Sequence, residues 1–344
     1  MTSRERMVRT LTFQSVDRAP RTLWSLPRVS EDRKDEYDAM LERFPGDITG
    51  PGVAYNKGKR EKGTFYQIGK AVDAWGCTFE ALERGVIGEV KRALFEDGYD
   101  DLPKYEPPWE LLDGMDARRG EIALLCAAAD QFVLAGTETR PFERMQFLRG
   151  TENLFIDLAL SEPGSYALRD MLHEFFLAEM RYWASTAVDG VSFMDDWGTQ
   201  KALLISPEKW REFYKPLYKE YCDILHAAGK FAFFHSDGFT EAIYPDLIEI
   251  GVDAVNTQLF CMDIEKLGAN YGGKIAFWGE IDRQWILPFG TPEDARRAVR
   301  RVHRAMCPGG VTTGVIAQCE WGAFDPAENV AAMFDEWDRI GASR

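Results

Sequence analysis

The sequence has no run of lysines or arginines and no apolar segment that approaches the length of a membrane-spanning helix. Its 41 basic residues are outnumbered by 56 acidic ones, which gives a formal net charge of −15. An acidic surface repels phosphate backbones and anionic lipid head groups, so nucleic acid and membranes are poor partners. The first residues, MTSRERMVRTLTF, lack the apolar stretch of a signal peptide. We therefore expect a cytoplasmic protein that acts on a small molecule.

Histidine is scarce, and nothing suggests a disulfide framework for the six cysteines. In a reducing compartment these cysteines are expected to be thiols. Three of the four histidines, His173, His226 and His303, lie in helical patterns and receive no role. His235 directly follows a predicted strand, which makes it the histidine most suited to chemistry.

A glycine-rich phosphate-binding turn after an early strand is also missing, so an open dinucleotide-binding sheet lacks support. Apolar strands alternate with helices through most of the 344 residues, which predicts a parallel sheet covered by helices. We predict an α/β fold, a (β/α)8 TIM barrel, formed by residues 1–344 as one domain. Residues 1–120 are read as an irregular N-terminal extension with the first strands, and residues 121–344 as regular β/α units.

Six strands are predicted in the regular part: Glu121–Ala129, Gly190–Met194, Lys230–Phe234, Asp253–Gln258, Lys274–Trp278 and Val315–Ala317. Three helix ends carry local signals. Ser206 and Thr291 each precede a proline and are predicted N-caps, and Gly251 is predicted to end a helix.

Catalytic residues of such barrels lie where the strands end, at one mouth. Here the strand ends carry ionisable or metal-binding side chains: Asp195, Asp196, His235, Asp237, Gln258, Cys261, Glu280, Asp282, Cys319 and Glu320. One imidazole and two thiols from three different strand ends suit zinc. We predict that His235, Cys261 and Cys319 bind zinc, with Glu280 or Asp237 supplying a displaceable oxygen. The alternative is a nucleophilic Cys319 activated by His235.

Adjacent Asp195 and Asp196 are candidates for acid–base catalysis, as is Asp237, although at least one of the pair is expected to cap a turn. Trp75 and Trp197 form either an aromatic wall of the pocket or part of the core. Together with Gln258 and Asp282 they complete the predicted substrate-binding residues.

Several long motifs resemble the uroporphyrinogen decarboxylase superfamily. They are RERMVRTLTFQSVDRAP, VDAWGCTFE, MDDWGTQKALLISPEKWREFYKPLYKEYCDILHAAGK, FHSDG, FWGEIDRQ and GTPEDARRAV. The resemblance covers nearly the whole chain and implies a (β/α)8 barrel with an N-terminal extension. It also suggests a homodimer.

The superfamily has a branch that decarboxylates uroporphyrinogen without a cofactor and a branch of zinc-dependent methyltransferases that work with corrinoid proteins. The decarboxylase's arginine-bearing N-terminal motif is absent, because this region reads TLWSLPRVSEDRK. Arg21 and Arg28 are the arginines left there to meet a carboxylate. Where the decarboxylase usually has a histidine near its last strand, this chain has Cys319.

The methyltransferase branch uses a His-x-Cys pair and a distant cysteine. His235 and Cys319 match two of these positions, but Asp237 replaces the middle cysteine and Glu280 stands where many relatives have glycine. The resemblance therefore implies a zinc-dependent methyltransferase acting on a methylated small molecule or thiol, with cobamide carried by a partner protein. The alternatives are a metal-free decarboxylase acting on a tetrapyrrole or other carboxylated substrate, and a non-catalytic sensor or scaffold.

Overall fold

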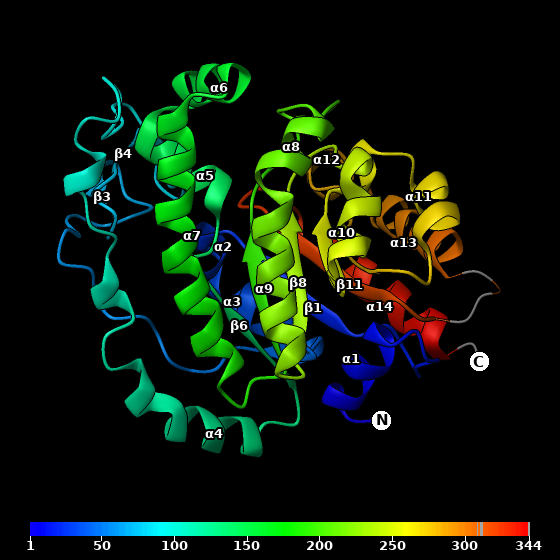
Figure 1. Ribbon diagram of the computed structural model, residues 1–344. Helices are drawn as coiled ribbons and strands as arrows, with labels where there is room; N and C mark the ends of the chain where they lie inside the picture. Colours follow the sequence, from blue (N-terminus) through cyan, green and yellow to red (C-terminus); the bar gives the residue numbers. More distant parts are fainter. Residues whose placement is uncertain (308, 310–311, 343–344) are drawn as a thin grey trace.

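The computed structural model describes residues 1–307, 309 and 312–342, and its centre is a parallel barrel (Figure 1). Eight strands follow one another in the order β1-β11-β10-β9-β8-β7-β6-β2. Their bounds are Arg21–Ser25 (β1), Ile48–Thr49 (β2), Phe132–Gly136 (β6), Gly190–Met194 (β7), Phe231–Ser236 (β8), Ala254–Thr257 (β9), Ala276–Glu280 (β10) and Val315–Trp321 (β11). The two end strands approach at their starts, where the Asp47 amide donates to the Arg21 carbonyl oxygen at 2.8 Å. The predicted (β/α)8 fold is confirmed.

Helices surround this barrel, and a small antiparallel sheet lies beside it. The sheet consists of β3 (Gly69–Val72), β4 (Thr78–Ala81) and β5 (Glu89–Val90). The α-helices are α1 (Ser3–Leu11), α2 (Pro27–Asp32), α3 (Lys34–Arg43), α4 (Arg119–Ala128), α5 (Pro141–Arg149), α6 (Thr151–Leu160), α7 (Pro163–Ala184), α8 (Pro207–Phe213), α9 (Lys215–Ala227), α10 (Tyr244–Ile250), α11 (Ile264–Tyr271), α12 (Ile286–Phe289), α13 (Pro292–Met306) and α14 (Ala327–Ala342). Short 3-10 turns are η1 (Leu102–Lys104), η2 (Trp109–Leu111), η3 (Met115–Arg118), η4 (Glu241–Ile243) and η5 (Leu259–Cys261).

One predicted strand is wrong, because the segment Glu121–Ala129 lies mostly in helix α4. Ile122 and Cys126, four residues apart, are buried, whereas Leu124 between them is 75% exposed. This spacing is that of one helical face, not of a strand buried on both sides. The barrel strand β6 follows at Phe132–Gly136 and is buried at its first four positions.

The local signals at three helix ends are confirmed. The Ser206 hydroxyl accepts from the Lys209 amide at 3.1 Å, and Thr291 forms a capping box with Asp294. Gly251 ends α10 with φ of 92°, a left-handed conformation that glycine adopts without steric cost.

Strand alternation divides the core into two layers. Phe132, Phe233, Ala254, Ala276, Trp278 and Ile316 form the inner layer, and Met7 and Leu11 of α1 pack against it. The helix layer packs on the opposite face of the strands in a second, larger cluster. Since α1 lies at the end of the barrel where the strands begin (Figure 1), we call the opposite end, where the strands finish, the mouth.

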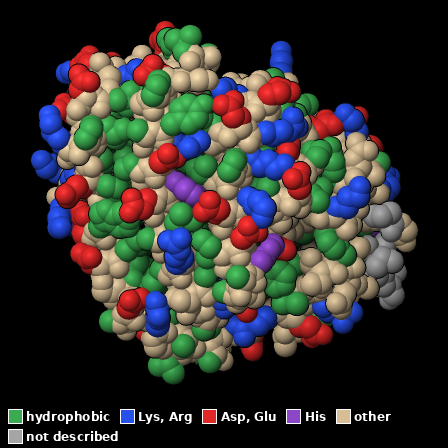
Figure 2. All heavy atoms as spheres, in the orientation of Figure 1, with side chains coloured by type: hydrophobic (Ala, Val, Ile, Leu, Met, Phe, Trp, Pro, Cys, Tyr) green, Lys and Arg blue, Asp and Glu red, His purple; other side chains and the backbone are tan. Residues whose placement is uncertain are grey.

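The surface is mixed in charge. Acidic and basic side chains are interspersed over the face shown in Figure 2. None of the helices in the described part of the chain is long and apolar enough to cross a membrane.

Candidate active site and metal centre

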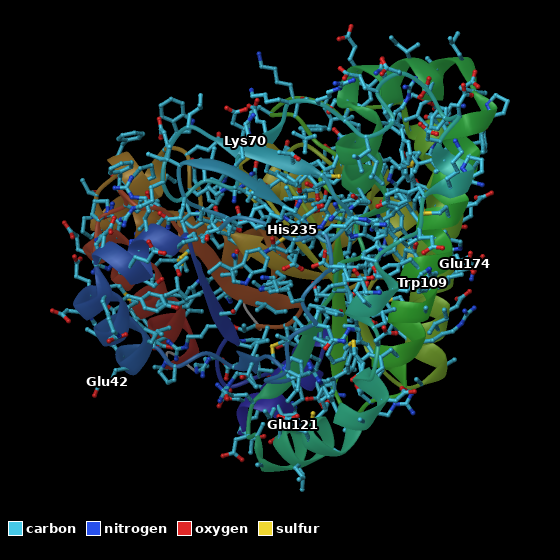
Figure 3. All side chains as sticks on the ribbon, turned by 90° about the vertical axis from the view of Figure 1, so that its left-hand side faces the viewer. Glu42, Lys70, Trp109, Glu121, Glu174 and His235 are labelled. Carbon is cyan, nitrogen blue, oxygen red and sulfur yellow. The ribbon has the colours of Figure 1, made fainter. Side chains whose placement is uncertain are left out.

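The inner positions of four strands become polar as the strands reach the mouth. His235 lies two residues after Phe233, and Asn256 two residues after Ala254. Glu280 likewise follows Trp278 at the end of β10. On β11, Gln318 and Glu320 continue the inward series that Ile316 begins. Because successive side chains of a strand point to opposite faces, these polar groups converge above the apolar inner layer. His235 accordingly lies near the centre of the molecule in Figure 3.

The His235 ring is held by Asn256. The Asn256 amide nitrogen donates to the Trp278 carbonyl oxygen at 2.7 Å, so its side-chain oxygen faces His235. That oxygen lies 2.5 Å from Nδ1 of His235 and accepts its proton. A neutral ring then carries its free lone pair on Nε2. The ring of Trp24 packs against the imidazole, with centroids 5.4 Å apart, which limits other ring orientations.

Nε2 of His235 faces two carboxylates. It lies 3.5 Å from Oδ1 of Asp196 and 3.7 Å from Oδ1 of Asp237. The Asp237 oxygen is buried and has no hydrogen-bond partner. Among described residues, Asp196, His235 and Asp237 are the one group of three candidate ligands with atoms within 4.8 Å of one another. Ligand atoms of a tetrahedral zinc ion lie about 2.0–2.2 Å from it and so roughly 3.3–3.6 Å apart, which these separations approach. The three residues therefore fit a divalent metal.

The adjacent aspartates have different partners. Asp195 is completely buried, and its carboxylate accepts from the amides of Phe142 and Glu143 and from the Tyr218 hydroxyl. It caps α5 and has the structural role expected for one of the pair. Asp196 accepts from the Asp237 amide at 2.9 Å and faces His235. Burial raises the pKa of both carboxyl groups.

A single guanidinium joins three carboxylates at the mouth. Arg283 pairs with Asp237, with Glu320 at 2.7 Å and with Glu280 at 3.5 Å. Glu280 is only 2% exposed, and neither of its carboxylate oxygens has a hydrogen-bond partner. Burial raises the pKa of Glu280 to about 7.

Glu143, in the first turn of α5, also has a buried carboxylate oxygen without a hydrogen-bond partner. Burial, together with the nearby charge of Asp196, raises its pKa to about 7. The mouth thus holds more carboxylates than cations.

The predicted thiolate ligands require correction. Cys319 is fully buried and belongs to the outer cluster with Ala317 and Trp321, because it alternates with the inward Gln318 and Glu320. Burial raises the pKa of its thiol well above the ordinary range. Cys261 lines a cavity at the mouth, between η5 and the loop that follows β10. Its thiol donates to the Gln258 carbonyl oxygen at 3.0 Å, and burial raises the pKa of this thiol to about 11. Among the described residues, neither cysteine belongs to the group of candidate metal ligands around His235, and neither does Glu280.

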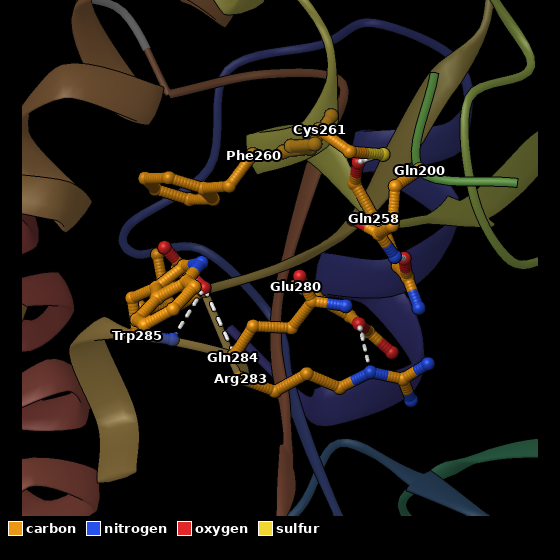
Figure 4. Close-up of a pocket in the computed structure, with 11 residues that line it drawn as sticks. Gln200, Gln258, Phe260, Cys261, Glu280, Arg283, Gln284 and Trp285 are labelled. Atoms are coloured by element: carbon orange, nitrogen blue, oxygen red, sulfur yellow. Dashed lines mark hydrogen bonds and ion pairs between the residues drawn. The ribbon is translucent and has the colours of Figure 1, made fainter. Parts of the chain in front are cut away.

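The predicted substrate-binding residues separate into two groups. Trp197 stacks on Phe142 with centroids 4.0 Å apart, and Trp75 packs on Phe175 at 4.9 Å; both are completely buried in the core. Gln258 (Figure 4) lines the cavity at the mouth. Asp282 lines this cavity as well. Asp282 also orders the loop after β10, because its carboxylate accepts from the amides at 284 and 285.

Sequence reasoning gave no role to several residues of the mouth. Strand alternation counted from Ile316 and Ala254 would have marked Glu320 and Asn256 as inward. Arg283 lies within the FWGEIDRQ motif, directly after Asp282, but the sequence pattern assigned it no role, because that role depends on which carboxylates the fold brings to it.

Comparison with known proteins gives a family and a fold. The family model "Uroporphyrinogen decarboxylase (URO-D)" matches residues 63–340. A methyltransferase from Methanosarcina mazei superposes with a TM-score of 0.71 at 15% identity, over 99% of this chain and 99% of that chain. An endo-beta-1,4-xylanase from Gloeophyllum trabeum gives a TM-score of 0.45 at 10% identity, over 96% and 98% of the two chains. No curated protein matches the sequence.

Proposed function

The chain belongs to the uroporphyrinogen decarboxylase family, and from that premise we propose that it is a zinc-dependent methyltransferase whose metal is held by His235, Asp196 and Asp237. The observation that carries the proposal is the Nε2 lone pair of His235, which the Asn256 hydrogen bond directs toward the two carboxylates. A metal ligand histidine commonly donates its other ring N–H to a fixed acceptor, as His235 does here. The likeness to a methyltransferase fold supports the same branch.

When bound, zinc supplies Lewis acidity toward a methyl-bearing oxygen or sulfur, or stabilises a thiolate. The chain's own residues prepare the site. Asn256 fixes the tautomer of His235, and Arg283 pairs with one oxygen of Asp237 while the other faces the imidazole. Glu143, whose pKa burial and the charge of Asp196 raise to about 7 in the absence of a metal, lies beside Asp196 and could exchange a proton with the substrate. We propose a corrinoid protein as the partner that exchanges the methyl group at the mouth.

Decarboxylation of a polycarboxylate suits this mouth less well. The three carboxylates that pair with Arg283 outnumber its guanidinium, and such a field repels a polyanionic substrate. The two arginines of the N-terminal region are engaged elsewhere. Arg21 pairs with Asp338 at 3.0 Å, and Arg28 pairs with Asp32 at 3.2 Å.

The proposal is tested by measuring metal content and methyl transfer together. Protein purified without chelators is expected to hold about one zinc per chain, and His235→Ala is expected to lose it. His226→Ala is the matched control, because His226 also pairs with an aspartate, Asp253 at 2.9 Å, but on the outer helix α9. Methyl transfer between methylcobamide and a panel of thiols and methylated compounds should require the metal. A His235→Ala protein that keeps its zinc, or metal-independent decarboxylation of a porphyrinogen, contradicts the proposal.

A further inference from the structure

A small cavity opens at the mouth between η5 and the loop that follows β10 (Figure 4). Its volume is about 130 Å³. Phe260 and Trp285 line one side, Gln258 and Cys261 line another, and Glu280 lies between them. Pockets for drug-sized ligands are typically about 300–1,000 Å³, so this cavity takes only a small group.

Glu280 contributes an unsatisfied negative charge to the cavity. Only 2% of Glu280 is exposed, yet neither of its carboxylate oxygens accepts a hydrogen bond. A buried carboxylate without hydrogen-bond partners is costly unless a ligand completes its environment. The nearest cation is Arg283, whose Nε lies 3.5 Å away, while its other nitrogens make closer contacts with Asp237 and Glu320.

The charges therefore do not balance. Arg283 is the one cationic side chain that lines the cavity, and it is shared among three carboxylates. Asp282 adds a further acidic side chain to the lining. A concave site with surplus negative charge concentrates cations.

The aromatic side chains select among cations. Trp285 is 69% exposed, and Phe260 lies beside it across the cavity entrance (Figure 4). Aromatic faces attract alkylated ammonium groups, which carry a diffuse charge and apolar methyl groups. A strongly hydrated metal ion would gain nothing from these rings. The Glu280 carboxylate inside the cavity and the aromatic faces at its rim together suit an alkylammonium group.

We propose that this cavity binds the alkylammonium group of a cationic substrate. The inference rests on the proposed function, because it places the substrate's charged end beside the methyl-transfer site. The connection is short: Arg283 contacts both Glu280 and Asp237, and Asp237 faces His235. The substrate's reactive end then points toward His235 while the ammonium group stays against Glu280.

Three ligands of similar shape and different charge test the proposal by calorimetry at about pH 8. Choline is the cation, 3,3-dimethylbutan-1-ol its neutral carbon analogue, and 3,3-dimethylbutanoate an anion with the same branched end. Choline is expected to bind about tenfold or more tightly than the neutral analogue, and the anion most weakly. Equal or tighter binding of the neutral or anionic compound, or no binding of choline at millimolar concentration, overturns the proposal.

Two variants place the binding in this cavity. Trp285→Ala removes an exposed ring and is expected to weaken choline binding about two- to fivefold. Phe289→Ala is the matched control, because Phe289 is 77% exposed and close to Trp285 but does not line the cavity. Glu280→Gln keeps the shape of the side chain and is expected to reduce the preference for choline over the neutral analogue about tenfold. Unchanged choline binding in both Trp285→Ala and Glu280→Gln overturns the assignment.

These binding measurements require neither methyl transfer nor a corrinoid protein, so they separate the two proposals. Choline binding that requires Trp285 and Glu280, in a protein that transfers no methyl group, supports the cation site and contradicts only the methyltransferase. Methyl transfer by a protein that prefers the neutral analogue contradicts only the cation site.

Discussion

The two ends of the barrel each contain a buried carboxylate, Asp47 where the strands begin and Glu280 at the mouth, but only Asp47 has hydrogen-bond partners. At the end where the strands begin, Asp47 is completely buried and accepts from Arg6 at 2.6 Å, from Arg18 at 2.6 and 3.0 Å and from the Arg21 amide at 2.8 Å. Burial acts to raise the pKa of Asp47, but the hydrogen bonds and charge of Arg18 hold it below its ordinary value. At the mouth, Glu280 is as deeply buried, lacks hydrogen-bond partners, and has its pKa raised to about 7.

The difference separates stability from function. Asp47 ties α1, the first strand and the start of β2 together, and it closes the barrel where β1 and β2 do not pair as strands. Its charge is fully used by the fold. The carboxylate of Glu280 accepts no hydrogen bond and has only its 3.5 Å ion pair with Arg283, so its burial costs free energy that a ligand or a proton would offset. In barrels of this class the end where strands begin serves stability and the mouth serves chemistry.

Asp47→Ala should show the largest effect of any single change at the stabilising end. It leaves Arg6 and Arg18 without their shared partner, and breaking a buried pair from one side costs about 3–5 kcal/mol. Urea unfolding followed by circular dichroism measures this loss. Asp17→Ala is the control, because Asp17 also pairs with Arg6 but is 45% exposed at its side chain, and its removal should cost about 1 kcal/mol. Equal effects of the two substitutions would mean that Asp47 has no special role.

For Glu280 we expect the opposite effect, because its negative charge destabilises the folded state. Because its folded pKa is raised to about 7, its protonated form favours folding, and that contribution is fully present below about pH 4.3 and is lost as pH rises through about 7. The loss should be on the order of 3 kcal/mol for the metal-free protein. Glu280→Gln removes this titration, so the stability difference between wild type and variant should grow in favour of the variant from pH 5 to pH 8. Parallel pH profiles of the two proteins would show that Glu280 is compensated after all.

Within the mouth, Asn256 supports a proposed metal ligand without being one, because it contacts His235 and not the metal itself. Removing such a supporting acceptor typically costs 10–100-fold in metal affinity. Asn256→Ala should therefore weaken zinc binding by about that factor in competition with a chromophoric chelator. Asn256→Asp keeps an acceptor for Nδ1 and should retain most of the affinity. A loss of similar size in both variants would indicate a packing defect, since Asn256 also donates to the Trp278 carbonyl oxygen.

Much of this architecture follows from sequence pattern, and the exceptions have physical causes. The strand Gly190–Met194 and the caps at Ser206 and Thr291 depend on neighbouring residues and were predictable. The apolar run at residues 121–129 predicts a strand where helix α4 forms, because such a run does not show by itself which of its residues are exposed.

At the site, sequence identified His235, Asp196 and Asp237 as strand-end residues, and the structure brings these three together. Ligand chemistry and the family resemblance favour Cys319 as a ligand, but the alternation along β11 turns Glu320 inward and Cys319 outward. A shift of one residue exchanges the mouth for the helix layer. The partners of Arg283 depend on three strand ends meeting in space, and no local pattern specifies that.

Cys319→Ala carries the smallest expected effect and the clearest consequence for the metal. The thiol lies in the outer layer against the helices, so its loss should leave zinc content and affinity unchanged and cost about 1 kcal/mol of stability. Cys222→Ala is the matched control, because Cys222 is equally buried in α9 and burial raises the pKa of its thiol as well. Metal analysis of both variants beside wild type makes the measurement. If Cys319→Ala lost zinc while Cys222→Ala kept it, a thiolate would have to reach the metal from the outer face of β11. The assignment of Cys319 to the outer core, and not to the inner site, would then be wrong.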